Sequence, residues 1–137
     1  MTQQQQTAAP QNTYRRGELW WVDFGNPIGR EIADVHPALI ISKQEFNDVA
    51  PRLGWLIIVP GTSTRIEVPR TNRIPVTHYE VPHSMANGLD HTTYFQCEQV
   101  RMVSTHRLQR LIGNLEFAHV RQIEERLCLV MDLFRRG

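Results

Sequence analysis

The sequence predicts a mainly β fold of the α+β class, a small and partly open β-barrel with an amphipathic helix at its C-terminal end. Short apolar or alternating segments follow one another at close spacing, separated by turns that contain Gly and Pro. The C-terminal stretch instead repeats its apolar residues every three or four positions, as a helix does. With 137 residues, the chain has room for one such domain.

The first half of the chain supplies a tail and three strands. Residues 1–13 carry no charged or aromatic side chain, so we expect a disordered tail before a single domain over residues 14–137. The aromatic-rich segment 17–24 predicts the first strand. The continuous apolar runs 37–42 and 54–59 predict strands that are covered on both faces.

The second half predicts a hairpin, a long strand and the helix. Segments 65–68 and 73–78 mix β-branched and charged residues around a Pro, which indicates edge strands. Segment 92–103 predicts one long strand. The apolar spacing from Leu115 to Phe134 predicts the helix, with Asn114 as its N-cap.

Composition limits the classes of function. The formal net charge is only +1, so any site for a polyanion has to be local. Lys43 is the only lysine among the 15 basic residues, and the arginine side chains suit bidentate contacts to phosphate. Two cysteines, Cys97 and Cys128, are too few for a disulfide framework. With no apolar run near about 18 residues and no signal-peptide pattern, we expect a cytoplasmic protein without a membrane anchor.

Polar residues gather where the two buried strands meet their loops. If segments 37–42 and 54–59 pair antiparallel, the start of one lies beside the end of the other, and His36 becomes a neighbour of Thr62. The two loops supply further candidates, namely Arg30, Glu31, Ser63 and Arg65. Imidazole, carboxylate, hydroxyl and guanidinium groups together suit proton transfer at a phosphodiester. The alternative is that His36 is an ordinary loop residue and that Thr62 and Ser63 cap a turn.

Other candidate sites carry weaker signals. Gln99 and Arg101 are two residues apart and would share one face of a strand. His78, His83 and His91 lie near one loop, but their gaps match no structural zinc spacing. We therefore expect neither a metal nor another cofactor.

Taken together, three stretches resemble the MazF/PemK family of toxin endoribonucleases. The first is Arg16-Gly17-Glu18-Leu19-Trp20-Trp21-Val22-Asp23-Phe24, followed by Gly29-Arg30-Glu31 and Pro37-Ala38-Leu39-Ile40-Ile41-Ser42. The second is Val59-Pro60-Gly61-Thr62-Ser63, and the third is Glu98-Gln99-Val100-Arg101 with Val103-Ser104. Their order and spacing, with the closing helix, span nearly the whole chain from Tyr14.

The resemblance implies an SH3-like barrel that forms a homodimer, binds a cognate MazE-like antitoxin and cleaves single-stranded mRNA at specific sequences without a metal. It places the catalytic positions of the family on Glu31, His36 and Thr62. With the residues above, this gives Arg30, Ser63, Arg65, Gln99 and Arg101 as candidate contacts to RNA phosphates. We expect attack of a ribose 2′-hydroxyl on the adjacent phosphate.

One position departs from the family, which usually has Arg immediately before the Pro where this chain has His36. Arg holds a phosphate, whereas His can give or take a proton. Either the chemistry is redistributed over His36 and the nearby arginines, or the chain is an attenuated, antitoxin-binding relative. A non-enzymatic gyrase poison of the related CcdB type is the alternative from another class.

Overall fold

The structure, a computed structural model, describes residues 13–133. Residues 1–12 of the predicted tail (1–13) and the end of the predicted helix at 134 therefore lie outside the described residues. The strands are β1 (Glu18–Asp23), β2 (Val35–Ile40), β3 (Trp55–Thr62), β4 (His78–Val81), β5 (Thr93–Gln96), β6 (Arg101–Ser104) and β7 (Leu108–Asn114). The α-helices are α2 (Gln44–Asp48), α3 (Ala50–Leu53) and α4 (Phe117–Met131), and the 3-10 turns are η1 (Cys97–Gln99) and η2 (Thr105–Arg107).

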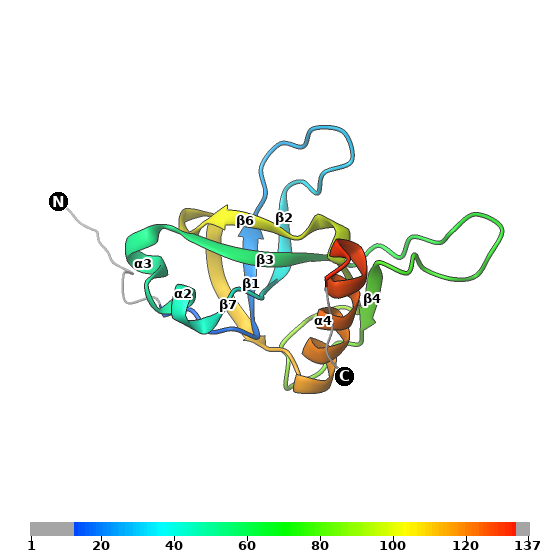
Figure 1. Ribbon diagram of the computed structural model, residues 1–137. Coiled ribbons are helices and arrows are strands. Elements are labelled where there is room, and N and C mark those ends of the chain that lie inside the picture. Colours follow the sequence, from blue (N-terminus) through cyan, green and yellow to red (C-terminus); the bar gives the residue numbers. More distant parts are fainter. Residues whose placement is uncertain (1–12, 134–137) are drawn as a thin grey trace.

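The seven strands form one curved antiparallel sheet that does not close. Its order is β4-β5-β3-β2-β1-β7, and β6 adds a further pairing to β3. The terminal strands β4 and β7 do not pair with each other, so the predicted partly open barrel is confirmed. Helix α4 lies beside β4 at one end of the molecule, and α2 and α3 lie at the other (Figure 1). Among residues 13–133, no helix has the length and apolarity to cross a membrane.

Alternation along the strands builds one apolar cluster on each face of the sheet. Ala38 and Ile40 of β2 belong to a cluster that also contains Val22 and Ile58 and no residue of α4. Leu39, which points to the other face, belongs to a second cluster that includes Ile123 of α4. Because successive side chains of a strand point to opposite faces, a strand buried on both sides reads as a continuous apolar run. Helix α4 therefore covers only one of the two faces.

The expectation of one long strand over 92–103 was wrong, because η1 divides it into β5 and β6. Both pieces pair with β3, Phe95 opposite Gly61 and Arg101 opposite Ile58. Between these two pairs, β3 covers three residues, whereas the segment from β5 to β6 covers six. The turn η1 accommodates the additional residues. A Cβ on Gly61 would lie 2.5 Å from Thr93 Cγ2, so a glycine here lets β5 pack closely against β3.

Two further expectations need correction. The predicted hairpin of segments 65–68 and 73–78 does not form, and only its last residue, His78, belongs to a strand, β4. Residues 63–77 form a protruding loop with a backbone hydrogen bond from Val68 N to Arg73 O of 2.8 Å (Figure 1). Asn114 is not the N-cap, because it belongs to β7, a strand that the sequence analysis missed, and pairs with Glu18. Glu116 occupies the N-cap position of α4 instead.

Candidate functional site

Three of the predicted site residues lie on the face of the sheet that α4 does not cover. Ala38 pairs with Pro60, and the same antiparallel register continued by two residues places His36 level with Thr62. Directly opposed residues share a face, so both side chains point to the side of Ala38. Arg101 pairs with Ile58 and joins that face from β6. The predicted pairing of the two buried strands is thus confirmed, and it brings these three elements together.

An aromatic ring connects the imidazole and the guanidinium. The Phe24 ring centroid lies 6.5 Å from that of His36, and the Arg101 guanidinium carbon lies 5.7 Å from the Phe24 centroid. The ring fixes the direction of the arginine through a cation–π contact. The sequence analysis missed this role of Phe24, although its alternation with Val22 and Trp20 along one strand was the available signal.

The loop between β1 and β2, residues 24–34, carries Arg30 and Glu31. Phe24 N donates to Asp34 O at 2.8 Å and Asp34 N donates to Gly25 O at 3.0 Å, which closes the base of the loop. Glu31 Oε1 accepts from the backbone N–H of Ile28 at 3.0 Å, so this carboxylate shapes its own loop.

Gln99 contacts this loop. Its Nε2 donates to Arg30 O at 2.9 Å and its Oε1 accepts from Ile32 N at 3.2 Å. The expectation that Gln99 and Arg101 share one strand face was wrong, because Gln99 ends η1 and lies outside β6.

The end of β3 contributes a buried hydroxyl beside an exposed one. Thr62 Oγ1 accepts from Thr64 N at 3.2 Å, which leaves its hydroxyl proton available as a donor, and Ser63 is exposed. Arg65 is already occupied: its Nε lies 2.9 Å from Glu67 Oε2 and its Nη1 lies 3.5 Å from Glu80 Oε1. The hydrogen bond to Glu67 raises the pKa of Arg65.

The remaining candidates are structural. His78 is buried, with Nε2 3.0 Å from Glu98 Oε2, while His83 and His91 are exposed. No group of three His, Cys, Asp or Glu side chains within residues 13–133 could hold a metal ion. Cys97, the first residue of η1, is buried in the apolar cluster that contains Ile123, and this burial raises the pKa of its thiol to about 12.

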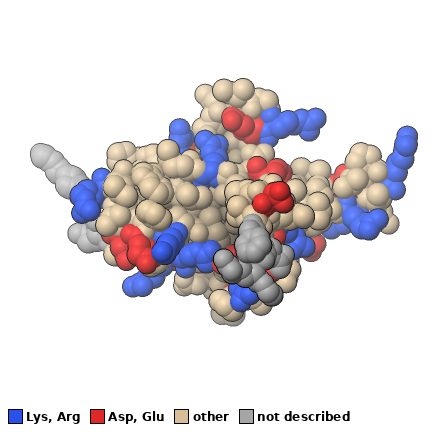
Figure 2. Space-filling view, viewed as in Figure 1, with Lys and Arg blue, Asp and Glu red and all other residues tan. Residues whose placement is uncertain are grey.

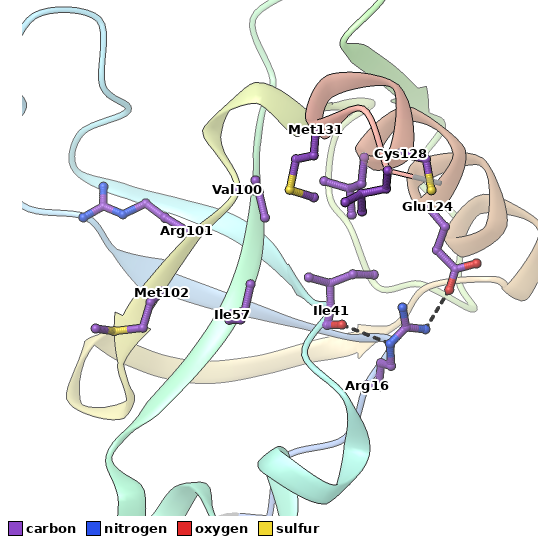
Figure 3. A pocket seen from close by; sticks show the side chains of 11 residues that line it. Arg16, Ile41, Ile57, Val100, Arg101, Met102, Glu124, Cys128 and Met131 are labelled. Atoms are coloured by element: carbon purple, nitrogen blue, oxygen red, sulfur yellow. Dashed lines mark hydrogen bonds and ion pairs between the residues drawn. The ribbon is translucent and has the colours of Figure 1, made fainter. Parts of the chain in front are cut away.

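An apolar groove lies on the opposite face, between the sheet and α4. This groove has a volume of about 640 Å³, and its apolar lining includes Ile57, Val100 and Met102 from the sheet side and Met131 from α4 (Figure 3). Arg16 and Glu124 border it and form an ion pair of 2.8 Å. Arg101 also borders the groove but directs its guanidinium away from these apolar side chains (Figure 3).

The face seen in Figure 2 carries no large patch of charge of one sign. In Figure 2, basic side chains are scattered over the visible face and extend from the two protruding loops, with acidic groups between them. This pattern agrees with the net charge of +1. A polyanion would find local contacts here and no continuous basic surface.

Comparisons with known proteins place these features in a family. The family model described as "PemK-like, MazF-like toxin of type II toxin-antitoxin system" matches residues 15–131. The chain is 36% identical over 123 residues to endoribonuclease MazF9 of Mycobacterium tuberculosis, covering 88% of this chain and 98% of that protein. It is 25% identical to endoribonuclease EndoA of Bacillus subtilis, covering 87% and 95%.

Solved structures show the same fold. The crystal structure of MazF from Deinococcus radiodurans matches with a TM-score of 0.70 at 18% identity, covering 89% of this chain and 99% of that one. An endoribonuclease from Mycobacterial species, solved in complex with its cognate antitoxin, matches with a TM-score of 0.62 at 19% identity, covering 91% and 99%. The match along the whole domain, with the identity to MazF9, shows that this chain belongs to the PemK-like, MazF-like family of toxins of type II toxin–antitoxin systems.

Proposed function

We infer that this chain is the endoribonuclease toxin of a type II toxin–antitoxin pair and that it cleaves single-stranded mRNA at specific sequences. Two relatives that align along most of the chain are endoribonucleases. The observation that carries the inference is the polar end of the sheet face that α4 does not cover, where the strand register sets His36, Thr62 and Arg101 on one side. These groups supply a proton carrier, a hydroxyl donor and a fixed positive charge.

The chemistry proposed for this site is transesterification within the RNA. The ribose 2′-oxygen forms a bond to the adjacent phosphorus while the bond from phosphorus to the 5′-oxygen of the next nucleotide breaks. The products are a 2′,3′-cyclic phosphate and a 5′-hydroxyl. The step needs a base for the 2′-hydroxyl proton, an acid for the leaving oxygen and donors for the phosphate.

Each residue is assigned the role that its surroundings allow. His36 transfers the proton, and Glu31 orients or deprotonates the attacking hydroxyl. Thr62 and Ser63 donate hydrogen bonds to the phosphate, and Arg101 or Arg30 stabilises its developing charge. Arg65 is the weaker phosphate ligand because Glu67 and Glu80 already occupy its guanidinium.

No metal takes part in this proposal. A two-metal or single-metal nuclease needs several carboxylate or imidazole ligands around one point. No such cluster is present among residues 13–133. In the proposed mechanism, the imidazole of His36 and the carboxylate of Glu31 move the protons without a metal.

The proposed partners are a MazE-like antitoxin and a second copy of the chain. The groove between the sheet and α4 exposes Met102, Met131 and Leu133 by 60%, 45% and 50%, and a second copy would remove these side chains from water. A cytoplasmic location agrees with the mRNA substrate and with the free thiols of Cys97 and Cys128.

The test is cleavage of a defined single-stranded RNA by the purified chain, with sequencing of the new 5′ ends. We expect 5′-hydroxyl ends at a recurring short sequence, and no cleavage when the nucleotide before the scissile bond lacks its 2′-hydroxyl. Inhibition of gyrase without RNA cleavage would instead support the non-enzymatic alternative. Antitoxin binding with neither activity would identify an attenuated relative.

A further inference from the structure

The side-chain amide of Gln99 forms hydrogen bonds to the backbone of the β1–β2 loop through both its nitrogen and its oxygen. Its Nε2 donates to Arg30 O at 2.9 Å, and its Oε1 accepts from Ile32 N at 3.2 Å. The amide thus contacts a backbone C=O and a backbone N–H two residues apart, as the edge of a neighbouring strand would do. The loop thereby gains a cross-strand contact although no strand lies beside it.

The turn that carries Gln99 is itself held firmly. Glu98, the preceding residue, is bound through Oε2 to Nε2 of the buried His78 at 3.0 Å. Cys97 N donates to Thr77 O at 3.0 Å and Val100 N donates to Cys97 O at 3.3 Å. The side chain of Gln99 therefore extends from a fixed base.

The loop, in contrast, has few anchors of its own beyond its base. Its outer part is held by the two hydrogen bonds between Glu31 and Ile28, of 3.0 and 3.2 Å, and by burial of the Ile32 side chain. Ile28 is 81% exposed. Local opening of such a segment costs little free energy unless a further contact holds it.

We propose that Gln99 is a positioning residue that holds the β1–β2 loop over the polar end of the sheet, and that it acts on cleavage through Arg30 and Glu31 and not by binding RNA itself. The inference rests on the proposed function, because those two loop residues matter only if RNA is cleaved there. Both polar atoms of the Gln99 amide are engaged in the protein without RNA, as a positioning residue requires.

The first measurement needs no RNA. Gln99→Met keeps the length of the side chain and removes both hydrogen bonds. In the free protein, we expect the Ile32 amide to exchange its hydrogen at least about tenfold faster in this variant, since its acceptor is lost. Gln109→Met, at an exposed position on β7, is the matched control and leaves the Ile32 amide unchanged. Unchanged exchange at Ile32 in Gln99→Met would overturn the proposal.

The second measurement separates positioning from binding. A misplaced loop lowers kcat by about 10- to 100-fold, while the affinity for an uncleavable RNA with a 2′-deoxyribose at the scissile position stays within about threefold. Weakened affinity with unchanged exchange would make Gln99 an RNA contact. Unchanged kcat despite faster exchange would also refute the positioning role.

A second substitution guards against a folding defect. Gln99→Glu keeps an acceptor for Ile32 N but, as a carboxylate, cannot donate to Arg30 O. We expect a kcat between those of the parent and Gln99→Met, with an unchanged circular dichroism spectrum. A parent protein that cleaves no RNA would refute the proposed function alone, because exchange at Ile32 still reports whether Gln99 holds the loop.

Discussion

His36 stands where the family resemblance expects an arginine, and the proposed mechanism assigns proton transfer to it. The register of Ala38 with Pro60, continued by two residues, sets His36 level with Thr62. The His36 and Phe24 ring centroids are 6.5 Å apart, and Arg101 joins the same face from β6. We predict that His36→Ala lowers the cleavage rate by about 10²- to 10⁴-fold and leaves affinity for uncleavable RNA within a few fold. Single-turnover cleavage and RNA titration measure the two quantities.

Two further variants sharpen this prediction. His83→Ala changes an exposed histidine of another loop and should leave the rate unchanged. His36→Arg restores the common residue of the family but removes the proton carrier, so we expect a rate well below that of the parent. Full activity of His36→Ala, or a gain in His36→Arg, would show that His36 is not the proton carrier.

Cys97 is a buried thiol with a pKa raised to about 12 by desolvation. Since only the thiolate reacts, the thiol form that dominates below this pKa is inert. We predict that iodoacetamide at pH 8 leaves Cys97 unmodified in the folded protein and labels it after denaturation. Peptide mass spectrometry reads the labelled position, and rapid labelling in the folded state would contradict the assignment of Cys97 to the core.

At the scale of elements, the start of α4 is tied to the loop that precedes β5. Glu116 Oε2 accepts from Ser84 Oγ at 2.7 Å and its Oε1 accepts from Asn87 Nδ2 at 3.1 Å. Desolvation raises the pKa of Glu116, but the hydrogen bonds from Ser84, its own backbone N–H and Asn87 outweigh it, and the net pKa is lowered. The charged carboxylate therefore stabilises the folded state.

The sign of the pH dependence follows from this lowered pKa. The stabilisation is fully present above the pKa that Glu116 has in the unfolded chain and is lost as the pH falls through its lower folded pKa. We predict that Glu116→Gln lowers the free energy of unfolding by about 1 kcal/mol at pH 7 and that this difference shrinks at acidic pH. Urea unfolding at several pH values, with Glu45→Gln as an exposed control, measures it.

At the scale of the molecule, the open groove predicts self-association. Met102 of β6 lines the apolar groove and is 60% exposed, and burying a charge there without a partner is costly. We predict a dimer at micromolar concentration and a monomer for Met102→Glu. Met85→Glu, at a fully exposed methionine outside the groove, should remain dimeric. Light scattering distinguishes the states, and a monomeric parent would contradict the prediction.

The absence of a ligand cluster among residues 13–133 leads to a prediction about the whole enzyme. If general acid–base groups carry the reaction, cleavage continues in excess EDTA at the rate seen without it. The measurement is a cleavage time course with and without the chelator. Loss of activity that magnesium restores would require a metal-assisted mechanism.

The buried strands and the closing helix could be predicted from the sequence because their signals are local. The apolar runs 37–42 and 54–59 and the helical spacing of α4 reflect which side chains avoid water, and burial of apolar area dominates folding. The antiparallel pairing expected of these strands also made His36 an expected neighbour of Thr62, and the strands do pair antiparallel. The candidate site was predictable to that extent.

Contacts between distant segments could be decided only by the tertiary structure. The turn η1 divides segment 92–103 because one part of β3 pairs with β5 and another part pairs with β6. Gln99 donates a hydrogen bond to a loop residue 69 positions away, and Arg65 forms an ion pair with Glu80. Both contacts likewise join chain segments that meet only after folding. A side chain's preference for apolar or polar surroundings follows from its own chemistry, whereas its hydrogen-bond partner depends on the geometry of the whole sheet.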